Sequence, residues 1–456
     1  MKKILSILIT VCILASSLFC VGANAAYDDV MKSMELYSDC VLLISADNSE
    51  IIFEKNAGKQ TAPASLTKVI TSIVVLENCP DLSAVVTVPE SCIRELDGTG
   101  SSLGGLMAGE MLSVYDLLCC LLLKSANEAA TTLADYVSGG DRAKFISMMN
   151  ETAQRLGCAN SHFVNPHGLD DEDQYITAND MATFIMHAMT FPAFEEIVAK
   201  NTYALPETNL QKERILYSTN YMLNSAYKDY YCKYVKGGKT GSTSTAGRCM
   251  VAYASNNGYN YVAVALNSTF YDVDSDGVNE NGSFLDCKEM LEWTYKNIEL
   301  VAICDTNEIK AQLPVLYAKD TDYITLSPAE TVYSLVPKGT DSSSLVVEIV
   351  EGSAPESLKA PVKKGDVICR GNVMYAGRVI KEIDLVASMD AKMSIFAFIG
   401  TNAKKLFSSW PFRIIALIVI AALVVLIFLK RKKDDSKPTD SKSYRILNYN
   451  DFMKLK

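Results

Sequence analysis

The sequence of 456 residues contains only three histidines and no Cys-x-x-Cys pair. Zinc sites take cysteine and histidine ligands at short, regular spacings, and the three histidines show no such spacing. We therefore predict no zinc site and no cofactor, and we assign no residue to a metal. Basic residues are also in deficit, because the formal net charge is −10. A nucleic-acid-binding protein needs a basic face toward the phosphates, so we exclude nucleic acid as a partner.

The 13 cysteines do not indicate a set of disulfides. Cys12 and Cys20 lie in a segment that we expect to be removed, and 13 less these two leaves 11, an odd number. Several of the others, such as Cys119 and Cys120, lie inside apolar runs. We predict buried free thiols that pack as small hydrophobic side chains.

The chain begins with a pattern that is typical of a secretory signal peptide. Lys2 and Lys3 are followed by a mostly apolar run over residues 4–21 and by Ala23-Asn24-Ala25, which fits a cleavage site. We predict a signal peptide over residues 1–25, cleaved near Ala25. The alternative is an N-terminal membrane anchor.

A second apolar run predicts a transmembrane helix near the other end. Residues 414–429 carry no charge, Trp410 marks the outer edge, and Lys430-Arg431-Lys432-Lys433 follows at once. Basic residues mark the cytoplasmic side of a membrane. We therefore predict a single-pass protein of the cell membrane, with a helix over 411–430, a cytoplasmic tail over 431–456 and an extracellular catalytic part.

The exported part divides into two domains by its pattern. Strand-like runs at 41–45 and 249–266 enclose a series of helical segments, which predicts an α/β (α+β) domain over 26–299 whose sheet unites its two ends. From about residue 300, short β-branched runs alternate with turns, which predicts a small all-β sandwich over 300–390. Residues 391–410 are then either a juxtamembrane linker or a segment on the membrane surface.

Ser65 and Lys68 lie at the start of an apolar helical run. Residues three apart share a helix face, so the lysine amine can take the proton from the serine hydroxyl. One such match carries little weight by itself, because Ser225 and Lys228 repeat the spacing.

Two further motifs follow in order. Ser125-Ala126-Asn127 comes at the end of an apolar helix that begins with Ser113 and Asp116, a capping-box pattern. Lys239-Thr240-Gly241 precedes a pair of strands and occurs once. The three motifs in this order are typical of class A β-lactamases and penicillin-binding proteins.

With these motifs, the chain resembles the serine-type D-alanyl-D-alanine carboxypeptidases of peptidase family S11, which are low-molecular-mass penicillin-binding proteins. The resemblance extends over residues 27–387 and implies a serine β-lactamase/transpeptidase-like catalytic domain followed by the family's β domain. It is carried by the segments 56–57, 63–68, 116–118, 125–130, 167–170, 239–243, 246–247 and 360–366.

The resemblance implies three catalytic residues, Ser65, Lys68 and Ser125, and it implies Asn127 as a substrate-binding residue beside them. Ser65 attacks the carbonyl carbon of the penultimate D-alanine and forms an acyl-enzyme. Neutral Lys68 is the general base, Ser125 relays a proton to the leaving amine, and Asn127 orients Lys68 and the substrate amide.

The resemblance also implies the substrate-binding residues. Lys239 and Thr240 hold the terminal carboxylate, Gly241 allows the substrate to approach the strand, and the N–H groups of Ser65 and Ser242 form the oxyanion hole.

The sequence departs from the family and from the β-lactamases at two places. The family's arginine in the loop before the last helix of the domain is absent from residues 267–283. Carboxylate recognition then depends on Lys239, Thr240 and Ser242 alone, or uses Arg248.

Class A β-lactamases activate the deacylating water with a glutamate before a Leu-Asn pair, and Asn220 occupies that place before Leu223-Asn224. We therefore expect penicillins to acylate the serine and remain attached.

Two other features have non-catalytic interpretations. His167 lies in a family motif, but the Ser–Lys pair already supplies a base, so we predict a structural role near the cleft. Residues 272–277 are similar to the first half of a calcium loop, with Ser283 in place of the last ligand. Calcium binding and a solvated acidic hairpin are the alternatives there.

The leading hypothesis is a carboxypeptidase that removes the terminal D-alanine from peptidoglycan pentapeptide stems, with β-lactams as covalent inhibitors. One alternative is D,D-endopeptidase action on cross-links by the same site. The other is a catalytically weak β-lactam sensor or wall-binding protein, against which the intact set of motifs argues.

Overall fold

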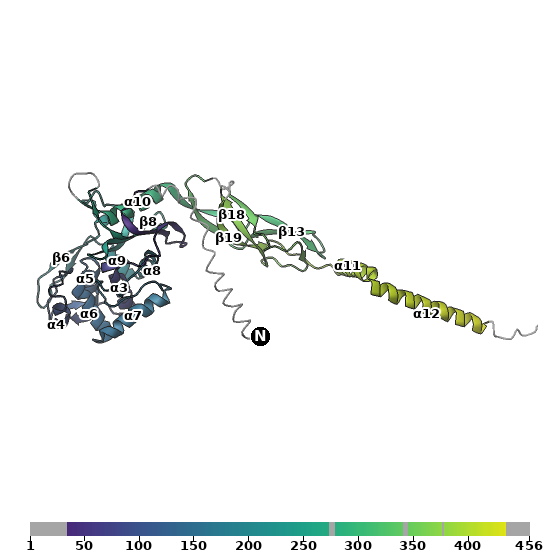
Figure 1. Cartoon of the computed structure of the whole chain (residues 1–456), viewed down its shortest axis with the longest axis horizontal. Coiled ribbons are helices and arrows are strands. Elements are labelled where there is room, and N and C mark those ends of the chain that lie inside the picture. Colours follow the sequence, from purple (N-terminus) through teal and green to yellow (C-terminus); the bar gives the residue numbers. More distant parts are fainter. Residues whose placement is uncertain (1–33, 273–278, 341–344, 376–377, 435–456) are drawn as a thin grey trace, which may run out of the picture. The chain divides into compact units, whose positions relative to one another are not determined.

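The computed structural model describes residues 34–272, 279–340, 345–375 and 378–434, which form two compact units (Figure 1). The first comprises the described residues through Glu308, together with Pro328–Ser353 and Cys369–Leu385. The second comprises Ile309–Ser327, Ala354–Ile368 and the described residues from Val386 onward. The predicted signal peptide, most of the predicted tail and residues 273–277 of the acidic loop lie outside the described residues.

A five-stranded sheet lies at the centre of the first unit. Its strand order is β2-β1-β9-β8-β7, and all neighbouring strands are antiparallel. The strands are β1 Ser38–Ser45, β2 Ile51–Lys55, β7 Val235–Thr243, β8 Gly247–Asn256 and β9 Tyr259–Ser268. Because β1 pairs with β9, the sheet joins segments more than 200 residues apart in sequence, which confirms the prediction that it unites the two ends of the domain.

Both faces of this sheet are buried. Along β1, Val41 and Leu43 belong to one hydrophobic cluster, and Leu42 and Ile44 belong to the other. This alternation follows from the two-residue period of a strand. Helix α10, Gly282–Asn297, covers the first face, and a group of helices that includes α3 and α8 covers the second (Figure 1).

The helical region supplies most of the core on the second face. It contains α3 Thr67–Asn78, α4 Glu90–Arg94, α5 Val114–Leu122, α6 Asn127–Ser138, α7 Arg142–Arg155, α8 Ala178–Ala188 and α9 Pro192–Val198. Ser113 and Asp116 form the predicted capping box at the start of α5. The eleven described cysteines are all buried and free, which confirms the prediction of unpaired thiols.

Short elements connect these helices and strands. Three antiparallel pairs are β3 Val85–Thr87 with β4 Met111–Ser113, β5 Thr202–Leu205 with β6 Arg214–Tyr217, and β10 Phe270–Tyr271 with β11 Glu280–Asn281. Two 3₁₀ turns are η1 Ala64–Leu66 and η2 Tyr221–Leu223.

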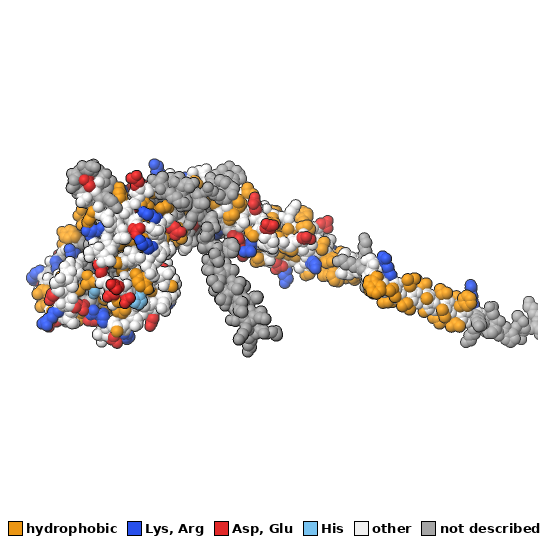
Figure 2. Space-filling view, viewed as in Figure 1, with side chains coloured by type: hydrophobic (Ala, Val, Ile, Leu, Met, Phe, Trp, Pro, Cys, Tyr) orange, Lys and Arg blue, Asp and Glu red, His pale blue; other side chains and the backbone are white. Residues whose placement is uncertain are grey.

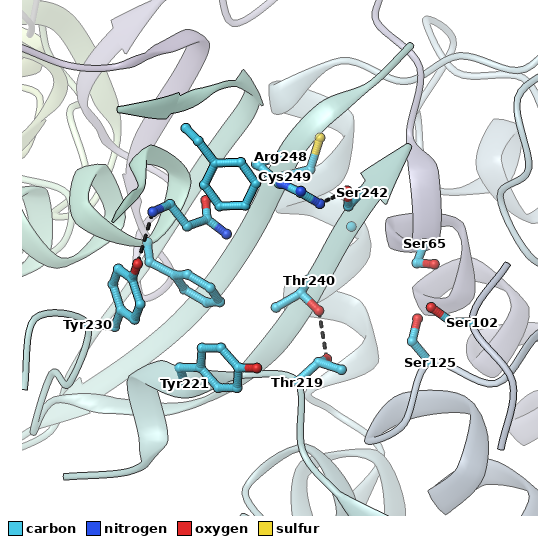
Figure 3. A pocket seen from close by; sticks show the side chains of 14 residues that line it. Ser65, Ser102, Ser125, Thr219, Tyr221, Tyr230, Thr240, Ser242, Arg248 and Cys249 are labelled. Carbon is cyan, nitrogen blue, oxygen red and sulfur yellow. Dashed lines mark hydrogen bonds between the residues drawn. The ribbon is translucent and has the colours of Figure 1, made fainter. Parts of the chain in front are cut away.

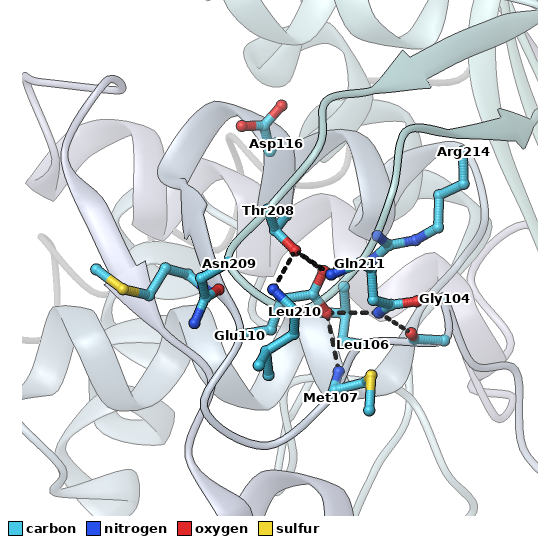
Figure 4. A network of polar contacts seen from close by, with 12 residues as sticks. Gly104, Leu106, Met107, Glu110, Asp116, Thr208, Asn209, Leu210, Gln211 and Arg214 are labelled. Carbon is cyan, nitrogen blue, oxygen red and sulfur yellow. Dashed lines mark hydrogen bonds and ion pairs between the residues drawn. The ribbon is translucent and has the colours of Figure 1, made fainter.

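A buried carboxylate fastens the β5–β6 hairpin to the loop before β4 (Figure 4). Glu110 is 0% exposed, and it accepts hydrogen bonds from the Met107 N–H, Thr208 Oγ1, Gln211 Nε2 and Arg214 at 2.8–2.9 Å. Burial disfavours the charged form, but the hydrogen bonds outweigh it and the pKa of Glu110 is lowered. The carboxylate is therefore held in its ionised form beside Arg214.

Replacing Glu110 by alanine is expected to lower the free energy of unfolding by about 3–5 kcal/mol, because Arg214 would lose its charge partner in a largely buried place. Urea denaturation followed by circular dichroism measures the change. Glu207→Ala is the matched control, because its pair with Lys212 is 58% and 86% exposed. That variant should change stability by less than about 1 kcal/mol. Equal losses in the two variants would contradict this account.

The regular elements described between residues 298 and 387 are all strands, which confirms the predicted C-terminal β domain. Strand β12 pairs with β15, β16 pairs with β18, and β13 pairs with both β14 and β17. The bounds are β12 Ile298–Cys304, β13 Ala311–Leu316, β14 Tyr323–Pro328, β15 Val332–Pro337, β16 Leu345–Ile349, β17 Leu358–Lys359, β18 Val367–Tyr375 and β19 Arg378–Ala387.

Two helices follow the strands, α11 Ile395–Ser408 and α12 Trp410–Asp434. Within α12, Trp410–Arg431 is the one stretch among the described residues that is long and apolar enough to cross a membrane, with 22 residues and a mean hydropathy of 3.2. Its hydrophobic side chains are exposed (Figure 2). Helix α11 also exposes apolar side chains, of which Phe396 is 89% exposed. The predicted juxtamembrane segment therefore contains a helix with exposed apolar side chains, and both alternatives for residues 391–410 stay predictions.

Candidate active site

Ser65 lies in the turn η1, directly before α3. Ala64 has a left-handed backbone (φ 47°) at this turn. Lys68 follows one helical turn later, and its Nζ lies 2.9 Å from Ser65 Oγ. The shared face that the sequence predicted for the two side chains is confirmed.

The amine of Lys68 is enclosed by acceptors. Lys68 is 0% exposed, and Nζ donates to Asn127 Oδ1 and to the His167 carbonyl oxygen, each at 2.6 Å. Burial, and then the Lys239 cation, hold the pKa of Lys68 well below its usual value, whereas Glu128 acts in the opposite direction. A neutral amine has two N–H groups for these two acceptors and one lone pair for the hydroxyl proton of Ser65. The arrangement therefore fits a general base.

A second buried lysine lies against the second serine. Lys239 is 1% exposed, and its Nζ donates to Ser125 Oγ at 3.0 Å and to the Thr240 carbonyl oxygen at 2.9 Å. Burial lowers the pKa of Lys239 to about 7. Ser125 lies between α5 and α6 with a positive φ of 61°. The two lysines thus hold the hydroxyl groups of the two serines.

Strand β7 is an edge strand of the sheet and passes directly over the turn that holds Ser65. A Cβ on Gly241 would lie 3.3 Å from the nitrogen of Ser65 and 3.2 Å from the carbonyl oxygen of Pro63. A side chain at residue 241 would therefore crowd the turn that holds the nucleophile, and the predicted role of Gly241 toward the substrate stays a prediction. The neighbouring Thr240 Oγ1 lies 2.7 Å from Thr219 Oγ1.

The loop that contains His167 supports both the base and the nucleophile turn. Burial, and then the nearby Lys68 side chain, lower the pKa of His167 to about 3, so the ring is neutral and cannot accept a proton near neutral pH. Its Nδ1 accepts the N–H of Leu169 at 3.2 Å, and its carbonyl holds Lys68. Gly168 has φ 93°, and a Cβ there would lie 1.8 Å from the carbonyl oxygen of Ala64. These contacts support the structural role predicted for His167.

A cavity of about 310 Å³ opens beside Ser65 and Ser125 (Figure 3). Thr240, Ser242 and Arg248 also line it, and Arg248 is the only charged side chain among its described lining residues. The guanidinium carbon of Arg248 lies 4.1 Å from the centre of the Phe270 ring, and Nη1 donates to Ser242 Oγ. A cation that is fixed in this way suits a negatively charged group in the cavity.

Three aromatic side chains that the sequence did not predict for the site line one side of the same cavity. Tyr221, Tyr230 and Phe284 line it, and the ring of Phe284 lies 5.8 Å and 5.0 Å from the rings of Tyr221 and Tyr230. These residues come from η2, the loop after it and α10, so no spacing in the sequence groups them.

A second cavity of about 270 Å³ adjoins Ser65 from the other direction. Asn127, His167, Asp170 and Thr243 are among its lining residues. Asp170 Oδ1 accepts a hydrogen bond from Thr243 Oγ1 at 2.6 Å. Because His167 is neutral, Asp170 is the only charged side chain among the described residues that line this cavity.

The eight residues predicted for the site gather around these two cavities or directly behind them. They are Ser65, Lys68, Ser125, Asn127, Lys239, Thr240, Gly241 and Ser242. The repeat of the first motif at Ser225 and Lys228 does not belong to the group, and both side chains are exposed.

The chain is similar in sequence and in structure to known proteins. A family model described as D-alanyl-D-alanine carboxypeptidase matches residues 27–269, and one described as penicillin-binding protein 5, C-terminal domain, matches residues 299–392. The chain is 26% identical over 412 residues to D-alanyl-D-alanine carboxypeptidase DacF of Bacillus subtilis, which covers 90% of this chain and 99% of that protein. It is 27% identical over 383 residues to D-alanyl-D-alanine carboxypeptidase DacC of Escherichia coli, covering 81% and 89% of the two chains. A solved structure of penicillin-binding protein 5 from Haemophilus influenzae matches with a TM-score of 0.62 and 26% identity, covering 79% of this chain and 98% of that chain.

Proposed function

The chain belongs to the D-alanyl-D-alanine carboxypeptidase family, and we propose that it removes the terminal D-alanine from peptidoglycan stem peptides through an acyl-enzyme on Ser65. One observation carries the assignment of the nucleophile. Ser65 Oγ lies 2.9 Å from the amine of the fully buried Lys68. Burial lowers the pKa of that amine well below its usual value, which favours the neutral form that a base needs.

Acylation begins when Lys68 takes the hydroxyl proton of Ser65 and Oγ forms a bond to the carbonyl carbon. The N–H groups of Ser65 and Ser242 stabilise the oxygen that becomes negative, by about 3 kcal/mol for each donor. The carbon–nitrogen bond then breaks, and Ser125 passes a proton to the nitrogen of the leaving D-alanine. The proton that Lys68 took from Ser65 then replaces the one lost from Ser125, so that Lys68 is neutral again for deacylation. Lys239 keeps its charge and holds the Ser125 hydroxyl in place by a hydrogen bond.

The terminal carboxylate of the substrate is assigned to the cavity that contains Thr240, Ser242 and Arg248. Of the two alternatives from the sequence, the one that uses Arg248 is favoured. Its guanidinium is fixed by Phe270 and Ser242 in the cavity beside the nucleophile. Buried Lys239 adds positive charge from behind the strand.

Deacylation requires a water molecule that Lys68 and Ser125 activate in turn. Asn220 occupies the place of the β-lactamase glutamate, and its side chain is 4% exposed. An amide cannot act as a general base. A penicilloyl group on Ser65 is therefore expected to be hydrolysed slowly.

The pH dependence of kcat/KM follows from the two lysines. Lys68 must be neutral to act as a base, so the rate rises with pH on the acid side. Lys239 is cationic below a pKa of about 7 and loses its charge above it, so carboxylate binding weakens as pH rises through that value. We expect a bell-shaped profile for D-alanine release from a peptide. Lys239→Arg carries a charge that does not titrate, so its alkaline limb should disappear. A flat wild-type profile between about pH 6 and 9 would contradict both assignments.

The alternatives are less well supported. A sensor with an inactive site would not need both lysines in hydrogen-bond contact with the two serines. Endopeptidase action would use the same residues, and no feature of the described cavities favours it.

The protein is membrane-associated, and the part of the chain that the structure describes contains one candidate membrane-spanning helix, Trp410–Arg431. We propose that a signal peptide is cleaved near Ala25 and that the basic end of α12 lies in the cytoplasm. Lys430 and Arg431 at that end support the orientation, which places the catalytic domain outside the cell.

The test is incubation of the full chain, in detergent, with a pentapeptide that ends in D-Ala-D-Ala. Release of one D-alanine per peptide, measured with a D-amino-acid oxidase, is expected. Absence of release together with stable penicillin binding would instead identify a sensor.

A further inference from the structure

We propose that Asp170 selects stem peptides in which the residue immediately before the acylated D-alanine carries a free, cationic side chain. The inference rests on the proposed function, because it concerns the substrate of the same site. It assigns a ligand group to the second cavity, which is lined by Asp170 and Thr243.

The two cavities that meet at Ser65 have opposite charge. The first is lined by Arg248 and the second by Asp170, each of which is the only charged group that lines its cavity within the described ranges. Ser65 belongs to both. A substrate that extends through both cavities therefore meets a cation at one end and an anion at the other.

The catalytic residues decide which part of the substrate enters each cavity. Ser125, which protonates the leaving group, and Thr240, which binds the terminal carboxylate, line the first cavity. Asn127, which holds the amide on the acyl side, lines the second. The leaving D-alanine thus occupies the first cavity, and the peptide on the acyl side occupies the second.

A substrate peptide that binds along β7 can reach Asp170 with a side-chain amine. Gly241 is level with the nucleophile, and Thr243, which hydrogen bonds to Asp170, is two residues further along the strand. This separation is about 7 Å at about 3.3 Å per residue. A peptide that extends along the free edge of β7 places the residue before the acylated alanine about 3.5 Å from it. A side chain of lysine length then spans the remaining distance.

The carboxylate of Asp170 is placed to receive such a group. Thr243 Oγ1 donates to Oδ1 and itself accepts the N–H of Ala246 at 2.9 Å, so the carboxylate is fixed at the mouth of the cavity. Its side chain is exposed, so that an approaching amine does not need to be fully desolvated. The neighbouring exposed residues Asp171 and Glu172 add negative charge within a Debye length.

The test compares two pentapeptides that end in D-Ala-D-Ala and differ only at the amine of one lysine side chain. One has lysine before the acylated D-alanine, and the other has Nε-acetyl-lysine. The full chain should prefer the free amine by about two- to fivefold in kcat/KM, as expected for an exposed ion pair. The ratio of the two kcat/KM values should fall toward one in high salt, because salt screens the ion pair between Asp170 and the substrate amine.

Two variants assign the preference to one carboxylate. In Asp170→Asn, the ratio of the two kcat/KM values should fall to about one. Glu172→Gln removes the same charge from an exposed residue that does not line the cavity, and it should keep the ratio. Equal rates for the two peptides with the wild-type chain, or an unchanged ratio in Asp170→Asn, would overturn this inference and leave the proposed function intact. No D-alanine release from either peptide would instead overturn the proposed function and the inference with it.

Discussion

Replacing Ser65 by alanine is expected to reduce D-alanine release at least about 10⁴-fold, because the acyl bond of the proposed mechanism forms on the Ser65 hydroxyl. The hydroxyl is the only part that changes, and it is a half-buried group at the turn before α3. The fold should therefore persist, and near-UV circular dichroism of the variant should match the wild type. The rate is measured with the pentapeptide at a concentration well below KM.

The chain supplies its own control for this substitution. Ser225 is followed three residues later by Lys228, which repeats the spacing of Ser65 and Lys68. The side chains of Ser225 and Lys228 are exposed and lie outside the site. Ser225→Ala should leave the rate unchanged. A loss of less than tenfold in Ser65→Ala, or an equal loss in Ser225→Ala, would show that the nucleophile is elsewhere.

Replacing Lys68 by methionine is expected to lower the acylation rate by about 10²–10⁴-fold, which is the usual contribution of a general base. Methionine has a similar length and keeps the buried volume filled. It leaves Asn127 Oδ1 and the His167 carbonyl oxygen without the amine as a donor, which costs about 1–3 kcal/mol for each buried group. The variant should therefore be less stable but still folded. Stopped-flow measurement of penicillin acylation separates the rate from the later hydrolysis.

Lys228→Met is the matched control for Lys68→Met, because Lys228 has the same spacing from a serine and an exposed side chain. It should acylate at the wild-type rate. A folded Lys68→Met variant that reacts as fast as the wild type would exclude Lys68 as the base.

The sequence was sufficient to predict the catalytic motifs and the capping of α5. A nucleophile and its base must lie on one helix face, so Ser65 and Lys68 have a fixed spacing that can be recognised. The capping box of Ser113 and Asp116 is equally local. Strand patterns at both ends of the domain predicted a sheet that unites them, and the pairing of β1 with β9 provides this connection.

Features that depend on distant contacts could not be predicted. The bond between Asp170 and Thr243 joins residues 73 apart, and Glu110 reaches Arg214 across 104 residues. No periodicity or local spacing encodes such pairs, because the chain path between them decides whether they meet. The position of Arg248 over Phe270 likewise depends on the approach of β10 to β8. The sequence therefore offered Arg248 only as one of two alternatives.

Buried charge explains why the site differs from a surface patch of similar composition. Lys68 and Lys239 are 0% and 1% exposed, and the loss of water around them lowers the pKa of both amines. Exposed lysines such as Lys228 experience no comparable loss of solvent. The sequence motif identifies the residue types, but burial in the folded domain gives the amines their reactivity.

The most direct test of the account is intact mass spectrometry of the full chain after exposure to benzylpenicillin. Opening of the β-lactam ring adds the whole molecule to the nucleophile, so the mass should increase by that of one penicillin and persist after the free drug is removed. Peptide mapping should place the adduct on Ser65, and Ser65→Ala should gain no mass. An adduct on the Ser65→Ala chain, or no adduct on the wild-type chain, would contradict the central claim that Ser65 is the acylated nucleophile.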